Sequence, residues 1–290
     1  MKKKLLIILL TVFSFNAINA EVTWKISDDG TLTISGTDMP NYYTGAPWFE
    51  NKDKIKKIVI ENGVTNIGSG AFYHCDNLTS ITIPNSVTNI GDEAFYKCSG
   101  LTSIVIPNAS IGNDAFYECE ALTSVTIGNS NGNSAVSIGK LAFERCSNIT
   151  SLTLGNSVTS IGEAAFYGCY QILPFIIPSS VKSIGNEAFA YCSSLFSLTN
   201  LATVPQEISE GTFDNRDGKP LHVLPGCKAA YEAAEYWKDF TIIEDATTGI
   251  DAVEGPATIS SDKIFSISGQ RLDKAAKGVN IINGKKVLVK

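Results

Sequence analysis

A phenylalanine followed three residues later by a cysteine occurs six times at nearly regular intervals, and this internal repeat constrains the fold most. The pairs are Phe72/Cys75, Phe95/Cys98, Phe116/Cys119, Phe143/Cys146, Phe166/Cys169 and Phe189/Cys192. Successive phenylalanines are 23, 21, 27, 23 and 23 residues apart. A repeat of this length is typical of stacked coils, in which each coil contacts only its neighbours.

One coil shows how the stack would form. The segment from Leu78 to Cys98 reads LTSITIPNSVTNIGDEAFYKC. A short β-branched strand ends at Pro84, a second extended piece follows, and an acidic start predicts a short helical or 3₁₀ turn containing Phe95 and Cys98. One such coil cannot bury its apolar residues by itself, but stacked copies can.

The frame L-x-x-I-x-I with a cysteine at fixed phase resembles leucine-rich repeats. The longer pattern I-P-x-x-V-x-x-I-G-x-x-A-F-x-x-C, nearly intact from Ile83 to Cys98 and from Ile177 to Cys192, is similar to the bacterial BspA-like class. The resemblance covers roughly residues 55–201. It implies an α/β, right-handed leucine-rich-repeat solenoid of about six to seven coils, rich in β-strand.

The flanking segments predict the rest of the domain organisation. Basic residues 2–4, an apolar run and a small-residue site predict a signal peptide over residues 1–20. An N-terminal β cap is expected over 21–54, with a hairpin about Asp28-Asp29-Gly30. The solenoid, including its C-terminal cap, is expected to span 55–245. Residues 227–240 would form the helix of that cap.

A linker is expected at 246–258, followed by a small β segment at 259–290 with a hairpin turn at Asn283-Gly284. This tail resembles the C-terminal sorting domains of exported Bacteroidetes proteins. Ser268-Gly269-Gln270-Arg271 and the run from Gly278 to Lys290 carry the resemblance, although Asn280 replaces the family's usual aromatic residue. The expected location is therefore extracellular or on the outer cell surface.

The net charge excludes some partners. The full sequence carries −6, with 29 acidic and 23 basic residues, and lacks a basic cluster, which argues against nucleic acid. After the leader, no stretch is apolar enough to predict a transmembrane segment in the mature chain.

The repeated cysteines could form a metal site, disulfides or a packed column. Zinc ligands converge, whereas side chains in a stack run parallel. A coil spacing of about 4.8 Å permits disulfide bridges, although parallel Cβ vectors strain them. The favoured interpretation is a structural core column of reduced thiols. Its members are Cys75, Cys98, Cys119, Cys146, Cys169 and Cys192.

Few residues suit catalysis, so no enzyme activity, cofactor or metal is expected. Only His74 and His222 are histidines. His74 precedes a column cysteine, which is the usual start of a nucleophile pair. The other coils carry Lys, Glu, Arg, Gly and Tyr at that phase, which indicates an outward surface position.

The outward side of the first strand in each coil is the candidate binding face. Its middle is rich in Ser and Thr, which fits solubility, a sugar- or protein-binding platform, or an ordered water lattice. Farther along, Leu173, Ile176 and Phe196 would face solvent together, and such a patch indicates either a partner or a cover formed by the cap or tail. The candidate ligand-binding residues are Leu173, Ile176, Phe196, Thr150, Thr153 and Thr199.

Proteins similar to BspA are surface or secreted, and several bind host extracellular proteins or other cells. The resemblance therefore implies a secreted or cell-surface adhesion module with a protein ligand, such as a host extracellular protein. A structural surface spacer and a glycan-binding module are the alternatives.

Overall fold

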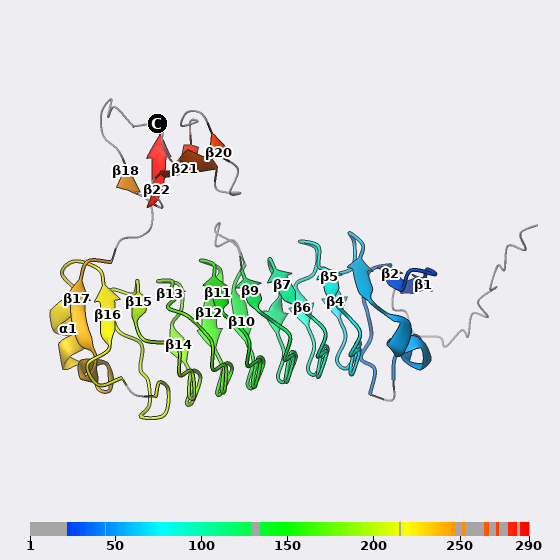
Figure 1. The fold of residues 1–290 in the computed structure, drawn as a ribbon, viewed down its shortest axis with the longest axis horizontal. Helices are drawn as coiled ribbons and strands as arrows, with labels where there is room; N and C mark the ends of the chain where they lie inside the picture. Colours follow the sequence, from blue (N-terminus) through cyan, green and yellow to red (C-terminus); the bar gives the residue numbers. More distant parts are fainter. Residues whose placement is uncertain are drawn as a thin grey trace, which may run out of the picture.

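The described chain winds into a solenoid of about 9 turns, each stacked on the one before (Figure 1). The structure is a computed structural model that describes residues 22–43, 45–128, 134–214 and 216–246 in full, together with the backbone of five short strands beyond them. The predicted solenoid is confirmed. The coil count was too low, because the stack continues through the segment predicted as the C-terminal cap.

The first strand of each coil lies on one side of the solenoid, which we call the strand face. Neighbouring strands run parallel, and residues at equivalent positions of successive repeats lie opposite one another. Ser103, for example, lies opposite Ser124, and Ile104 lies opposite Val125. The strands are β3 (Lys57–Ile60), β5 (Ser80–Thr82), β7 (Ser103–Ile106), β9 (Ser124–Ile127), β11 (Ser151–Leu154), β13 (Ile176–Ile177), β15 (Leu198–Asn200), β16 (Pro220–Val223) and β17 (Thr241–Glu244).

The second extended piece of each coil forms a six-stranded parallel sheet on another side. Its strands are β4 (Asn66–Ile67), β6 (Asn89–Ile90), β8 (Ser110–Ile111), β10 (Val136–Ile138), β12 (Val158–Ile161) and β14 (Ser183–Ile184). A glycine follows each strand and lies against the backbone of the preceding coil. A Cβ at Gly162 would lie 2.6 Å from the carbonyl carbon of Gly139, so this corner admits no side chain.

The third side of the solenoid consists of turns. The prediction of a short helical or 3₁₀ turn on this side is wrong. In the second coil, Glu93 and Lys97 have φ of 55° and 56°, in the left-handed region, which breaks any helix. The N–H groups of Glu93, Phe95 and Lys97 donate to carbonyls of the next coil at 2.7–2.9 Å. The same three N–H groups donate in this way in every coil from Gly70 to Gly168. In the next coil the Phe189 N–H donates to the Thr212 carbonyl and the Tyr191 N–H donates to the Asp214 carboxylate. We call this arrangement the turn ladder.

The core is a stack of phenylalanine rings. The rings of Phe116 and Phe143 are 4.9 Å apart with an interplanar angle of 1°, and the other pairs from Phe72 to Phe213 are at 4.9–5.3 Å. Trp48 at one end and Trp237 at the other continue the stack, at 5.5 and 5.6 Å from their neighbours. Both tryptophans are buried and close the core at its ends.

The N-terminal cap follows the prediction. Strands β1 (Thr23–Ile26) and β2 (Thr31–Ser35) form the expected antiparallel hairpin, and β2 pairs parallel with β3. A 3₁₀ helix, η1 (Phe49–Lys54), then leads into the first coil. The hairpin therefore extends the strand face by further strands and covers its first coil.

The C-terminal cap differs from the predicted helix over 227–240. Helix α1 covers only Lys228–Ala233, and a 3₁₀ turn, η2 (Trp237–Asp239), follows it. Tyr236 between them has φ of 63°, which ends any continuous helix. The break turns Trp237 into the core, where its ring packs at an angle of 53° against that of Phe213.

Five short strands form a separate sheet in the last part of the chain. They are β18 (Asp251–Ala252), β19 (Ile264–Ser266), β20 (Arg271–Leu272), β21 (Gly278–Ile282) and β22 (Lys285–Val289). Strands β21 and β22 pair antiparallel, as the hairpin prediction required. The predicted signal peptide lies outside the described residues, as does most of the predicted linker.

Candidate functional site

The middle of the strand face carries hydroxyl side chains, and one column of them bonds to the backbone. The Thr102 hydroxyl donates to the carbonyl of Thr79 at 3.2 Å, and the Thr150 hydroxyl donates to that of Thr123 at 3.2 Å. Thr79 and Thr123 do the same one coil earlier. These hydroxyl protons therefore stabilise the stack, and the predicted site residue Thr150 has its donor occupied.

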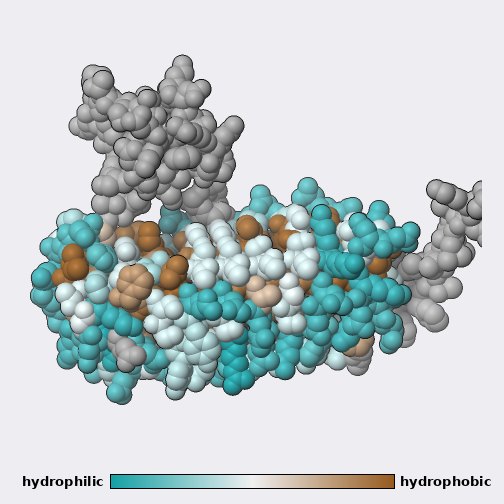
Figure 2. Space-filling model, viewed as in Figure 1, coloured by the Kyte–Doolittle hydropathy of each residue, from teal (hydrophilic) through white to brown (hydrophobic). Residues whose placement is uncertain are grey.

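Farther along the same face, apolar side chains replace the hydroxyls. Leu173 is 48% exposed, Ile176 47% and Phe196 62%. We call these three residues the apolar patch. Figure 2 shows hydrophobic side chains gathering toward the C-terminal end of the solenoid, at the left, whereas the middle of the visible face is largely pale.

The coil geometry brings the patch residues together. Leu173 and Phe196 have the same phase in successive coils, 23 residues apart. Ile176 on β13 lies opposite Thr199 on β15, which places the predicted site residue Thr199 at the edge of the patch. Thr153 is exposed on β11, one coil before Ile176.

The strand in this coil alternates between exposed and buried side chains. Ile176 is exposed, and Phe175 just before it is buried. The Phe175 ring packs 5.1 Å from that of Phe189. The side chains of a strand alternate, so Phe175 and Ile177 point inward and Ile176 points outward.

Two exposed tyrosines near the patch were not predicted as site residues. Tyr170 is 49% exposed and Tyr191 55%. They line a hollow of about 540 Å³ with Ser193, Asp214 and Lys219. Both tyrosines lie beside column cysteines in the turns, where the repeat pattern suggested only outward surface positions.

The column cysteines are buried and unbridged. The Cys98 thiol donates to the carbonyl of Phe72 in the preceding coil at 3.1 Å, and the next four repeat this contact at 3.1–3.3 Å. Burial raises the pKa of Cys75 and of Cys192 to about 12. These two thiols are thus held in the unreactive protonated form.

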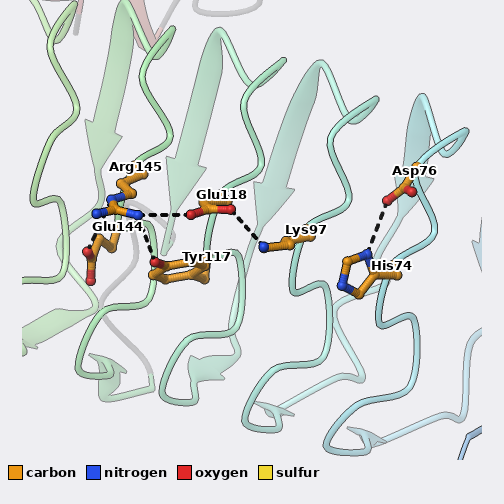
Figure 3. Close-up of polar contacts among 7 residues, drawn as sticks. All are labelled: His74, Asp76, Lys97, Tyr117, Glu118, Glu144 and Arg145. Carbon is orange, nitrogen blue, oxygen red and sulfur yellow. Dashed lines mark hydrogen bonds and ion pairs between the residues drawn. The ribbon is translucent and has the colours of Figure 1, made fainter.

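A chain of ion pairs crosses the turn ladder (Figure 3). Glu118 accepts from Lys97 at 3.1 Å and from Arg145 at 3.1 Å, each in a neighbouring coil. Burial alone would raise the pKa of Glu118, but hydrogen bonds from Lys97 and Arg145 outweigh it and lower that pKa. These pairs hold adjacent coils together.

His74 lies at the same phase as Lys97 and Glu118. Its ring is 3.7 Å from the Asp76 carboxylate and tilts against the ring of Tyr73, 4.6 Å away (Figure 3). The neighbouring Cys75 thiol is buried in the core, on the other side of the backbone. The two side chains do not form a nucleophile pair.

Within the described residues, no three His, Cys, Asp or Glu side chains converge as metal ligands would. In the same residues, no helix has the length and apolar character needed to cross a bilayer.

Solved structures similar to this chain are bacterial leucine-rich repeat proteins, and no curated protein matches it. A leucine-rich cell surface protein from Faecalibacterium prausnitzii A2-165 is 24% identical, with 80% of this chain and 77% of that chain covered and a TM-score of 0.49. The leucine-rich repeat protein of T. pallidum is 21% identical, with 60% and 87% covered and a TM-score of 0.47.

The family match follows the coils described above. The model of the BspA-type leucine-rich repeat region matches in 6 copies, over residues 43–133 and 109–223. These ranges contain every Phe/Cys pair and extend over more than half of the chain. The chain belongs to the BspA-type leucine-rich repeat family.

Proposed function

We propose that this protein is an exported, non-enzymatic interaction module that binds a protein ligand, such as a host extracellular protein, through the apolar patch. The observation that carries the proposal is the clustered exposure of Leu173, Ile176 and Phe196 on a face whose other exposed residues are mostly polar. Exposed apolar side chains that cluster on a polar surface mark interaction sites.

The chemistry of the patch favours a protein over a glycan. Its side chains are aliphatic or phenyl and offer no hydrogen-bonding groups, which a sugar would need. The hydroxyl column that leads to Leu173, which includes Thr150, already donates to the backbone. A partner that buries Phe196 in an apolar pocket would gain the anchor typical of protein interfaces.

The binding test uses charge reversal of the patch with a matched control on the same face. Leu173→Asp combined with Phe196→Asp should abolish saturable binding to members of a panel of purified extracellular proteins, measured by biolayer interferometry. Thr82→Asp combined with Val105→Asp adds the same charge three coils away, at exposed positions, and should leave binding unchanged.

If both double variants bound equally well, the proposal that the apolar patch binds the ligand would be contradicted. A saturable glycan hit with no protein ligand would favour the glycan-binding alternative, and no ligand of either kind would favour a structural spacer. A thermal melt of each variant shows whether a loss of binding is caused by a loss of folding.

Export is proposed from the sequence of residues 1–20 and of the tail. A basic start followed by a short apolar run directs secretion, and the tail resembles sorting domains. Cell fractionation of the full chain and of a chain lacking 259–290 tests this directly. We expect surface or extracellular full-length protein and periplasmic retention of the truncated one; periplasmic full-length protein would contradict the sorting role.

A further inference from the structure

We propose that an aromatic groove near the N-terminal end binds an organic cation, namely the side chain of a lysine or arginine presented by a basic polypeptide. The groove is formed by the loop before η1, the start of the first turn segment and the edge of the second. Its main lining side chains are Tyr42, Tyr43, Phe49, Tyr73, Asp92 and Glu93. The site lies several coils from the apolar patch and does not depend on it.

The groove lies where a stack of tyrosines ends. Tyr73 stacks on Tyr96 at 5.0 Å and 7°, and Tyr96 stacks on Tyr117 at 4.9 Å and 5°. Each inner ring has a neighbour on both faces. Tyr73 is the first ring of this stack and lines the groove with Phe49. The stack therefore ends at the groove.

Further rings face the same space. Tyr43 is 85% exposed and Phe49 37%, which is unusual for side chains of this size. Tyr42 is half-buried beside Trp48, with ring centroids 5.3 Å apart, and its burial raises the pKa of its hydroxyl to about 12. Tyr42 therefore keeps its proton at physiological pH. The faces of all three rings attract cations.

The protein itself places a cation on one of these rings. The Lys52 ammonium lies 5.0 Å from the centroid of the Phe49 ring. This distance is within the range of a cation–π contact. The ring environment is therefore compatible with an ammonium group.

The two carboxylates at the rim favour a cationic ligand. Asp92 and Glu93 are exposed and adjacent. The pKa of nearby Asp114 is raised, first by burial and then by the negative charges of Glu93 and Asp92. A cation placed between these carboxylates and the rings would relieve this repulsion, whereas an anion would add to it.

Size and arrangement favour a side chain over a metal ion. The groove has a volume of about 580 Å³, within the range that accommodates a long side chain and its flanking backbone. Two carboxylates beside aromatic rings suit an ammonium or guanidinium group. Three or more converging ligands, as a metal ion would require, occur nowhere in the described chain. The acidic net charge of −6 would also steer a basic polypeptide toward the protein.

Isothermal titration of the folded full chain with a blocked peptide containing an Arg-Lys pair tests the proposal. We expect saturable binding of this peptide and none of the same peptide with Glu-Glu. Asp92→Asn combined with Glu93→Gln should weaken binding at least tenfold. Glu207→Gln combined with Glu235→Gln removes the same charge at the opposite end and should change affinity less than twofold.

Two substitutions of Tyr43 test how much the aromatic rings contribute to the affinity for the peptide. Tyr43→Ser should weaken binding severalfold, whereas Tyr43→Phe keeps the ring face and should bind nearly as well as the original. Tyr43 is exposed, so neither change should alter the melting temperature. Loss of affinity in Tyr43→Phe equal to that in Tyr43→Ser would overturn the role of the ring face.

Three results would overturn the site as a whole. The first is no binding of the basic peptide. The second is an equal loss of affinity in both charge-neutralised double variants, which would indicate unspecific attraction to an acidic surface. The third is displacement of the peptide by a neutral oligosaccharide but not by tetramethylammonium, which would reassign the groove to a glycan. None of these results bears on binding at Leu173 and Phe196.

Discussion

Each phenylalanine of the core is held between two others, so one ring contributes to two coil interfaces. Phe143 lies 4.9 Å from Phe116 and 5.2 Å from Phe166, with nearly parallel planes. All three rings are fully buried. In a stacked repeat, stability is a sum of coil and interface terms, so the loss of one ring weakens two interfaces at once.

Phe143→Ala should therefore lower the free energy of unfolding by about 3–5 kcal/mol, because a large cavity opens in the core. Urea unfolding followed by circular dichroism measures this loss. Val204→Ala serves as the control, since Val204 is 76% exposed, and should change stability by roughly 0.5 kcal/mol or less. A loss below about 1 kcal/mol for Phe143→Ala would show that the stack relaxes around the gap.

The cysteines give the protein a dependence on alkaline pH. The ordinary thiol pKa is 9.0, and burial raises it to about 12 in Cys75 and Cys192. The folded thiols stay protonated between these values while the unfolded ones ionise. The stabilisation is therefore fully present below pH 9 and is lost as the pH rises from 9 to 12.

We expect the urea midpoint to be nearly constant from pH 7 to 8.5 and to fall steeply above pH 9. Cys75→Ala combined with Cys192→Ala should make this fall shallower, because two of the titrating groups are removed. A midpoint that is flat up to pH 11 would contradict the buried, protonated thiols. Slow alkylation of the native protein by iodoacetamide would support them independently.

At the scale of elements, the strands could be predicted from the sequence and the turns could not. Alternation of apolar and polar residues, as in Ser103–Ile106, directly reports which side chains face the core. The turn ladder gives no such signal, because its left-handed positions carry residues as different as Glu93, Leu141 and Ala164. Hydrogen bonds between coils impose this backbone, and a single coil read by itself resembles a helix.

The turn ladder predicts a stabilising glycine. Glu187 has φ of 56°, which costs a residue with a Cβ roughly 1–2 kcal/mol, and Gly70 occupies the equivalent position in the first coil. Glu187→Gly should raise stability by up to about 1 kcal/mol after the entropy of the unfolded chain is included. Glu207→Gly, at a position with ordinary φ, should lower stability instead. Equal losses in the two variants would show that the left-handed backbone carries no strain.

At the scale of the whole molecule, tryptophans mark both ends of one continuous core. Trp48 lies beside Phe72, and Trp237 lies beside Phe213. Between them the interfaces are nearly uniform, so no coil is an evident weak point. A uniform array with strong neighbour coupling unfolds as one unit.

Single-reporter variants can test this cooperativity. Trp237→Phe leaves the N-terminal reporters Trp24 and Trp48, whereas Trp24→Phe combined with Trp48→Phe leaves Trp237. When each fluorescence transition is compared with the circular dichroism transition of the same variant, we expect the two midpoints to coincide. Fluorescence that changes at lower urea than circular dichroism would show that one end frays separately.

The candidate sites differed in how far the sequence could predict them. Leu173, Ile176 and Phe196 were identified because they break a strict pattern of hydroxyl residues. The aromatic groove was missed because Tyr42, Tyr43 and Phe49 lie before the first complete repeat, where no pattern exists to break. Its members converge only when the loop before η1 folds against the turn of the next coil.

The coils differ in length, yet the core spacing does not change. Phe95 and Phe116 are 21 residues apart and Phe116 and Phe143 are 27 apart, but both ring pairs are separated by 4.9 Å. The extra residues fall between β9, which ends at Ile127, and β10, which begins at Val136. This corner is thus a natural insertion point, where a peptide epitope could be grafted without disturbing the stack or either proposed binding surface.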